Sequence, residues 1–358
     1  MGAYRSLLRP LLFRFDAETM HHATLSVCAA LGPAERATQR VLGFAHPRLS
    51  VEVGRLRFPG PVGLGGGFDK NGIAVRTLGA LGFGSIEVGS VSAAPSRGNA
   101  GRPRLFRLAD DEALLVNYGV PNDGAVTVAR RLQGVRLAVP LGVSLVETNT
   151  GRASSLDAVI EQFRNAAKTL SPVADYIALN LQCPNSDTGP FADPPGLAAL
   201  LSALDVPCPL FLKVAASTDP KAIDAFLQAV EPFASVRGFI LSTLLPKPYS
   251  GLRTPAQILQ GVPGSLTGAP LKVLARELVS AWYARIDRRR HHLVGVGGVQ
   301  SAEDAYALIR RGATLVQLVT ALVYQGPALP GRIHRGLDAL LERDGVARVG
   351  DAVGADSP

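Results

Sequence analysis

The chain contains eight short runs of apolar, often β-branched residues, and a stretch with helical spacing separates most of them. Strands that alternate with helices predict a parallel sheet, because each helix returns the chain to the same edge. Eight such units over roughly 270 residues match a (β/α)8 TIM barrel, and an open doubly wound sheet is the alternative. The eight predicted strands lie near residues 62–66, 85–89, 137–143, 176–181, 209–214, 237–242, 293–297 and 314–319.

Residues 1–45 precede the first strand and predict an N-terminal helical extension. A first basic, amphipathic helix is followed by a second from about Ala17 to Leu31, which should end before Gly32 and Pro33. The pair could cap the bottom of the barrel or rest on a membrane surface. Residues 46–345 then form the barrel, and residues 346–358 are expected to be a disordered tail. The first helix carries Leu7, Leu8, Leu11, Leu12 and Phe15 with Arg5, Arg9 and Arg14 between them.

The composition narrows the class of protein. With 47% apolar and 18% charged residues among 358, the chain can bury a substantial core. The net charge of +8 is spread along the chain, and the short basic cluster at residues 288–292 is typical of a solvated helix end, so nucleic acid is not expected as a partner. Cys28, Cys183 and Cys208 form no CxxC pair, which predicts no disulfide framework, no metal site and a reducing cytoplasm.

Polar residues gather where the predicted strands end, and in a barrel this is where catalytic groups lie. The fourth run breaks abruptly into Asn180, Cys183 and Asn185, and three glycines at residues 65–67 lead to Lys70 after the first run. Glycines permit close backbone approach to a ligand. The other polar strand ends are Ser90, Ser92, Ser144, Lys213, Ser242, Thr243, the glycine stretch 295–298 and Thr320.

The last two strand ends indicate a phosphate, since barrels commonly bind one after strands seven and eight. The stretch from Gly295 is not a dinucleotide fingerprint, because Gln300 stands where that motif needs glycine. All six histidines fall away from the predicted strand ends. Cys183 is therefore the leading candidate for a general base, and a buried, inert cysteine is the alternative.

Several motifs together resemble the dihydroorotate dehydrogenase family, specifically its membrane-associated, quinone-reducing class. The resemblance runs from the first residues to about Leu329 and implies an FMN-binding barrel. It also implies that the basic N-terminal helices face a membrane and admit a quinone, which favours that interpretation over a bottom cap. The matching motifs are residues 65–72, 83–90, 103–108, 180–185, Lys213, 295–298 and 315–317.

The resemblance implies a role for each site residue. Cys183 would remove a proton from the substrate as hydride passes to FMN. Substrate contacts are expected from Lys70, Asn180 and Asn185, with Thr243 and Asn117 near the positions of other substrate-binding residues. Contacts to FMN are expected from Gly66, Gly67, Ser90, Ser144, Lys213, Ser242, Gly268, Gly297, Gly298 and Thr320.

The chain departs from the family pattern at several of these positions. Cys183 is the base of the soluble class, whereas the membrane-associated class uses serine. Val116 stands where the family has asparagine, with Asn117 one place later, and residues 242–244 read Ser-Thr-Leu instead of Thr-Asn-Thr. Ser144 replaces a flavin-contacting asparagine.

The sequence therefore predicts an FMN-dependent oxidoreductase that oxidises dihydroorotate to orotate. It is expected to be a cytoplasmic monomer or weak homodimer, with a quinone as electron acceptor and peripheral membrane contact through residues 1–45. One alternative is a paralogue that uses FMN on another cyclic substrate, and a second is a flavin-binding protein without turnover.

Overall fold

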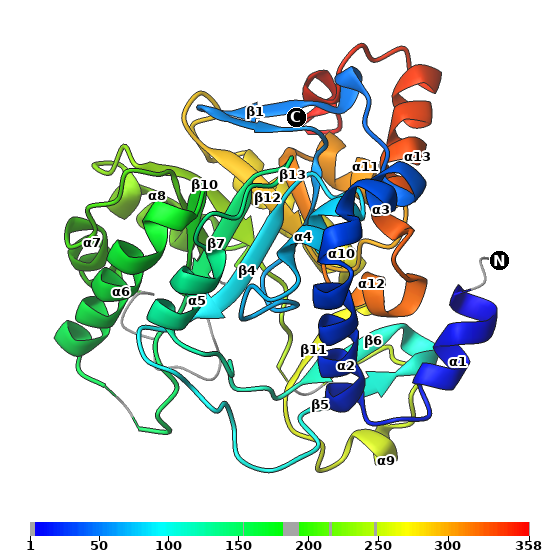
Figure 1. Ribbon diagram of the computed structural model, residues 1–358. Helices are drawn as coiled ribbons and strands as arrows, with labels where there is room; N and C mark the ends of the chain where they lie inside the picture. The colour runs from blue at the N-terminus through cyan, green and yellow to red at the C-terminus, as the bar shows by residue number, and fades with distance from the viewer. Residues whose placement is uncertain (1–3, 153, 182–192, 215–216, 247–248, 358) are drawn as a thin grey trace.

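A computed structural model describes residues 4–152, 154–181, 193–214, 217–246 and 249–357. Cys183 and Asn185 lie outside these residues. Figure 1 shows a barrel of strands surrounded by helices, with the hairpin of β1 at one end and the sheet of β5, β6 and β11 at the other. The first N-terminal helices lie against this second end of the molecule, whereas α3 (Glu35–Leu42) lies toward the end with the β1 hairpin (Figure 1).

Eight parallel strands close into the predicted TIM barrel. Each overlaps a predicted apolar run, and β7 begins at Leu141 because Pro140 lacks the N–H that a ladder needs. The final pairing, between Val316 of β13 and Val62 of β3, closes the circle. In barrel order the strands are β3 (Val62–Leu64), β4 (Ile86–Val91), β7 (Leu141–Leu145), β8 (Tyr176–Asn180), β9 (Leu210–Val214), β10 (Val236–Leu241), β12 (His292–Val296) and β13 (Ala313–Leu318).

Amphipathic helices bury the outer face of the barrel. Several begin at a capping side chain, such as Ser155, Asp219 and Ser301, which accepts a backbone N–H from the first turn. The covering helices are α4 (Val75–Ala80), α5 (Ala125–Leu132), α6 (Leu156–Leu170), α7 (Pro194–Ser202), α8 (Pro220–Val230), α10 (Lys272–Tyr283), α11 (Ala302–Arg310), α12 (Thr320–Gln325) and α13 (Leu329–Arg343).

Two antiparallel sheets lie at opposite ends of the barrel. The hairpin of β1 (Val51–Val53) and β2 (Leu56–Phe58) precedes the first barrel strand and places Phe58 in the barrel interior. The other sheet, β5 (Leu105–Leu108), β6 (Ala113–Val116) and β11 (Ser265–Gly268), is inserted after β4 and after β10. Both insertions leave the carboxyl ends of their strands, so this sheet stands beside the candidate site.

The N-terminal extension forms a turn of π-helix (Tyr4–Leu8), α1 (Arg9–Leu12), α2 (Ala17–Ala30) and α3 (Glu35–Leu42). The second helix ends one residue before Leu31, close to its predicted end. Helix α2 packs against β5 and α4, and the π-helical turn packs against α12. The first two helices therefore lie at the carboxyl end of the barrel, which does not fit a cap at the bottom. Among the described residues, no helix is long and apolar enough to cross a membrane.

The structure corrects the expectation of a disordered tail. A short 3-10 helix (Val349–Ala352) buries Val349 and Ala352. Further on, the backbone N–H of Gly354 donates to the Ile309 carbonyl, and Asp356 forms an ion pair with Arg310. Small and polar composition alone did not reveal these contacts, which join the tail to α11.

His334 in α13 is a buried histidine whose two ring nitrogens are both used. Its Nδ1 donates to the Gly82 carbonyl at 2.9 Å, and its Nε2 accepts the Val62 backbone N–H at 3.2 Å. This pattern requires the neutral ring. Burial lowers the pKa of His334 to about 4.

Because its folded-state pKa lies below 6.5, His334 stabilises the fold fully above about pH 6.5, and this stabilisation is lost as the pH falls toward 4. The loss is expected to be roughly 3 kcal/mol. Urea unfolding at pH 7 and pH 4 should therefore show a smaller pH dependence for His334→Gln than for the wild type. Equal pH dependence in the two proteins would contradict this role for His334.

Candidate active site

Three polar side chains from neighbouring strands meet at the carboxyl end of the barrel. The hydroxyl oxygens of Ser90 and Ser144 lie 2.9 Å apart, and the side-chain amide of Asn180 donates to Ser90 at 3.0 Å. These residues come from the ends of β4, β7 and β8, which are adjacent in the barrel. The structure thus joins into one hydrogen-bonded chain residues that the sequence placed at three separate strand ends.

The glycine loop after β3 is held close to β4. The backbone N–H of Gly66 donates to the Glu87 carboxyl at 3.2 Å, and that of Gly67 donates to the Gly89 carbonyl at 2.6 Å. Gly67 has a φ of +115°, which favours glycine. A Cβ atom at Gly66 would lie 2.6 Å from Glu87 Oε1. Lys70 turns back over this loop, and its Nζ donates to the Gly67 carbonyl at 2.6 Å.

The surroundings of Lys70 include a histidine that sequence reasoning missed. The Lys70 ammonium lies 4.2 Å from the centre of the Tyr118 ring, a cation–π contact. His21 of α2 meets the ring of Phe68 edge to face, with 5.1 Å between the ring centres. Burial, reinforced by the nearby Lys70 charge, lowers the pKa of His21 to about 3. His21 precedes every barrel strand, and only the folding of α2 over this end brings it here.

The fifth and sixth strand ends continue the site. Lys213 pairs in register with Asn180 across β8 and β9. Ser242 and Thr243 follow β10 and are both buried. The Thr243 hydroxyl donates to the Val296 carbonyl at 3.0 Å, so this hydroxyl is bonded to the backbone of β12.

The seventh and eighth strand ends supply glycines and a hydroxyl. Gly297, Gly298 and Gly268 have φ values of +133°, +71° and +116°. A Cβ atom at Gly297 would lie 2.1 Å from the Thr243 hydroxyl, so a side chain does not fit there. Thr320, the first residue of α12, has its hydroxyl 3.3 Å from that of Thr267.

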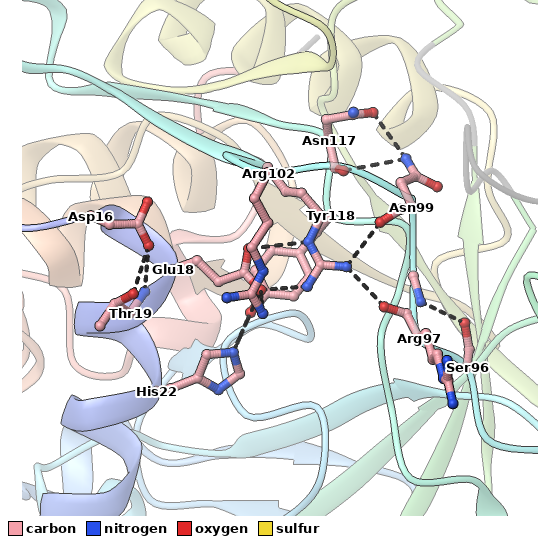
Figure 2. A network of polar contacts seen from close by, with 12 residues as sticks. Asp16, Glu18, Thr19, His22, Ser96, Arg97, Asn99, Arg102, Asn117 and Tyr118 are labelled. Atoms are coloured by element: carbon pink, nitrogen blue, oxygen red, sulfur yellow. Dashed lines mark hydrogen bonds and ion pairs between the residues drawn. The ribbon is translucent and has the colours of Figure 1, made fainter.

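Asn117 belongs to a polar network beside the site rather than to the chain of Ser90 and Ser144. Its carboxamide oxygen accepts from the Asn99 side chain at 2.9 Å, and its backbone N–H donates to the Arg104 carbonyl at 2.8 Å. Figure 2 shows Asn117 beside Asn99, at the edge of the network around Glu18 and Tyr118. Asn117 thus borders the loop that carries Arg104.

At the centre of this network a buried ion pair fastens α2 to the loop before β5. Glu18 is fully buried and accepts two hydrogen bonds from Arg104, while Arg102 lies 3.0 Å from the same carboxylate (Figure 2). The hydrogen bonds from Arg104 hold the pKa of Glu18 below its usual value. Tyr118 also bonds to His22 of the same helix at 3.0 Å. The helix is therefore fixed in position beside Lys70.

Below the glycine loop, Glu87 organises the barrel interior. Its carboxyl accepts from Gly66, from the Tyr176 hydroxyl at 3.3 Å and from the Gln317 side-chain amide at 2.9 Å. Glu87 is fully buried, and burial beside it raises the pKa of Tyr176. Both Glu87 and Gln317 fell within the matching motifs, but only the closed barrel shows that they meet.

A groove of about 460 Å³ lies beside the site, between the N-terminal segment and the β5–β6–β11 sheet. Most of its wall is apolar, and Arg107 supplies a positive charge. The Arg107 guanidinium lies 4.6 Å from the centre of the Phe13 ring and donates to the Phe15 carbonyl. The groove is lined by Phe13, Asp16, Ala17, Pro103, Leu105, Phe106, Arg107, Leu108, Ala109, Leu115, Ile258, Leu259 and Val262.

Comparison with known proteins assigns the chain to a family. The family model described as dihydroorotate dehydrogenase matches residues 48–341. The chain belongs to the dihydroorotate dehydrogenase family. A protein of Deinococcus deserti named dihydroorotate dehydrogenase (quinone) is 38% identical, with 99% of this chain and 100% of that protein covered. A protein of the same name from Halobacterium salinarum is 40% identical, with 98% and 99% covered.

Solved structures agree with this family assignment. The crystal structure of the family member from Eimeria tenella in complex with ferulenol has a TM-score of 0.81 and 26% sequence identity. That comparison covers 95% of this chain and 96% of the other. The resemblance predicted from the sequence motifs, including the quinone-type class, is therefore confirmed.

The residues present fit FMN, the cofactor of this family. Glycines at three strand ends carry a positive φ, and at Gly66, Gly268 and Gly297 an added Cβ would clash with the protein, so these positions carry no side chain. The hydroxyl groups of Ser90 and Ser144 stand at the ends of the neighbouring strands β4 and β7, and that of Thr320 follows β13. Backbone N–H groups and hydroxyls are the donors that a phosphate and a flavin ring require.

Replacing the Glu87 carboxyl should destabilise the barrel, because Gly66, Tyr176 and Gln317 would each lose a buried hydrogen-bond partner. Glu87→Ala is expected to lower the free energy of unfolding by about 3 kcal/mol. Urea titration of the purified proteins measures this change. Glu52→Ala removes a carboxyl from an exposed position of β1 and should change the stability by less than about 0.5 kcal/mol. Similar losses in the two variants would contradict the role of Glu87.

Proposed function

We propose that the chain is an FMN-dependent dihydroorotate dehydrogenase that oxidises dihydroorotate to orotate and delivers the electrons to a quinone. The observation that carries the proposal is the convergence of Ser90, Ser144 and Asn180 with the Lys70 loop at one end of the barrel. The names of the relatives point to the same reaction.

FMN supplies the hydride acceptor when it is bound. The chain's part is to hold it. In this proposal the hydroxyls of Ser90 and Ser144 and the ammonium of Lys213 face the ring, while backbone groups near Gly298 and Thr320 hold the phosphate. The full set of proposed cofactor contacts is Gly66, Gly67, Ser90, Ser144, Lys213, Ser242, Gly268, Gly297, Gly298 and Thr320.

Lys70, Asn180 and Asn185 are proposed to bind the substrate. The Lys70 ammonium lies between the Gly67 carbonyl and the Tyr118 ring, both of which favour its positive charge. A cation fixed there suits the carboxylate of dihydroorotate. Amide groups can bond to both the N–H and the C=O groups of a pyrimidine ring.

Cys183 is proposed to remove the substrate proton as hydride leaves for FMN. It follows β8 three residues after Asn180, and a thiolate can accept a proton near neutral pH when its pKa is lowered.

Cys183→Ala should still bind the yellow flavin. Reduction of the flavin by dihydroorotate should be at least about 100-fold slower than in the wild type, since a general base typically accelerates a reaction by this factor or more. The measurement is flavin bleaching after anaerobic mixing with dihydroorotate. Cys183→Ser, which restores the alcohol of the membrane-associated class, should retain more activity than Cys183→Ala. Cys28→Ala, a change at a cysteine in α2, is the control. An unchanged rate in Cys183→Ala would remove this residue from the mechanism.

A second candidate is oxidation of a different cyclic substrate by the same flavin. Three contacts favour it: Val116 pairs within the inserted sheet, the Asn117 amide oxygen is bonded to Asn99, and the Thr243 hydroxyl is bonded to Val296. A site that loses substrate hydrogen bonds loses discrimination. Wild-type flavin that stays oxidised with dihydroorotate but bleaches with another dihydropyrimidine would select this candidate.

We further propose that the quinone enters through the groove beside the N-terminal segment while that segment rests on a membrane. The groove is apolar, which suits a quinone ring and tail. Next to it the exposed fractions of Leu7, Leu8, Leu11 and Phe15 are 70%, 53%, 51% and 54%. Exposed leucines between arginines are typical of helices that lie on anionic lipid.

Leu7→Gln/Leu11→Gln should weaken binding to vesicles of anionic phospholipid by about tenfold or more, because two apolar side chains no longer enter the lipid. Co-sedimentation with vesicles measures the binding. Val126→Gln, at an exposed apolar position of α5, should bind as the wild type does. Equal binding by all three proteins would contradict contact through these leucines.

A further inference from the structure

Glu112 stands at the tip of the β5–β6 hairpin, and its carboxylate contacts four side chains from three separate parts of the chain. Its carboxylate accepts from the side-chain amide of Gln300, and the amide of Gln325 lies 3.4 Å away. On the other side Arg5 and Arg9 lie 3.4 and 3.7 Å from the same carboxylate. One half-buried acidic group thus joins the N-terminal segment to the loop after β12 and to α12.

The barrel partners of Glu112 adjoin the proposed phosphate-binding residues. Gln300 follows Gly298 by two residues, and Gln325 ends the helix that Thr320 begins. The Glu112 carbonyl also accepts the Ala269 backbone N–H at 3.3 Å, directly after Gly268. A Cβ atom at Gly268 would lie 2.6 Å from that carbonyl, so the contact is close. Glu112 therefore touches the loop after β12, helix α12 and the segment after Gly268, and each of these carries a proposed FMN contact.

The conformation of Glu112 itself is specialised. Its φ is +45°, in the left-handed region that residues other than glycine seldom adopt. Such a conformation persists where surrounding contacts fix it. Here the contacts come from both sides of the hairpin, from the two arginines of the N-terminal segment and from the two glutamines of the barrel. A shift of either group would therefore change the position of the Glu112 carboxylate relative to the other group.

The N-terminal segment has further anchors on the same helix. The Tyr4 hydroxyl donates to the Val323 carbonyl at 2.7 Å, and Arg9 reaches the Tyr324 carbonyl at 3.4 Å. The Phe13 ring meets that of Tyr324 with 5.4 Å between centres. Several contacts therefore link the docking of residues 4–13 to the position of α12. The ion pairs of Glu112 with Arg5 and Arg9 are among them.

We propose that Glu112 is a positioning residue that couples docking of the N-terminal segment to binding of FMN. In this proposal, bound FMN orders the loop after β12 and helix α12, and this fixes Gln300 and Gln325. These two amides then hold the Glu112 carboxylate in position to pair with Arg5 and Arg9. Coupling between two sites is reciprocal, so a docked segment also strengthens FMN binding. The inference rests on the proposed FMN site. It gives the membrane-facing segment a direct influence on retention of the cofactor.

The test combines two measurements on the full chain. FMN affinity is measured by quenching of FMN fluorescence on addition of the apoprotein, and docking by amide hydrogen exchange of residues 4–13 with and without FMN. In the wild type, saturating FMN should slow exchange of this segment by about five- to tenfold, within the usual range of coupling between sites. Glu112→Gln should lose that protection and bind FMN more weakly by a similar factor.

Arg5→Gln/Arg9→Gln removes the same contacts from the other side and keeps the test decisive if Glu112→Gln fails to fold. Its loss of FMN affinity should match that of Glu112→Gln, and combining all three changes should add little more, because both act on one interaction. Asp110→Asn, at an exposed acid of the same hairpin, is the matched control and should behave as the wild type.

Equal FMN affinity in the wild type and in both folded variants would overturn the coupling. Exchange of residues 4–13 that does not respond to FMN in the wild type would also overturn it. Wild-type apoprotein that quenches no FMN fluorescence at all would instead refute the proposed function, so the two failures are distinguishable.

Discussion

The hydrogen bonds of the Glu87 carboxyl hold the interior of the barrel together. This one group receives donors from β8, from β13 and from the loop after β3, while it is itself part of β4. A buried carboxyl destabilises the fold unless its oxygens accept hydrogen bonds. The strands that carry the donors must therefore pair in the one register that brings these donors to Glu87. The hydrogen bond from the Gly66 N–H to Glu87 also fixes the glycine loop of the candidate site on the barrel core.

Helix α2 of the N-terminal extension belongs to the surroundings of the candidate site. The buried pair of Glu18 and Arg104 fixes α2 on the loop before β5, and the same helix brings His21 next to Phe68. Removing one partner of a buried ion pair leaves an uncompensated charge. The position of α2, and through Tyr118 that of Lys70, therefore depends on an interaction made outside the barrel.

The barrel strands could be predicted from sequence because each is buried on both faces and shows as a short apolar run. The polar strand ends followed directly, and Ser90, Ser144 and Asn180 do meet. What the sequence could not show is pairing between distant segments. Glu87 and Gln317 belong to strands at opposite ends of the chain, and the inserted sheet combines residues 105–116 with 265–268. The orientation of a side chain was equally hidden, as with the Thr243 hydroxyl, which bonds to the backbone of β12.

The closure of the barrel also sets an order of events during synthesis. Val62 pairs with Val316, and Tyr4 and Arg9 bond to the carbonyls of Val323 and Tyr324. Tyr4, Arg9 and Val62 are thus made long before the residues with which they pair. Domains fold as units during translation, and contacts this remote in sequence form late. For much of its synthesis the nascent chain therefore carries residues 4–13 without the contacts to α12 that hold them in the folded protein.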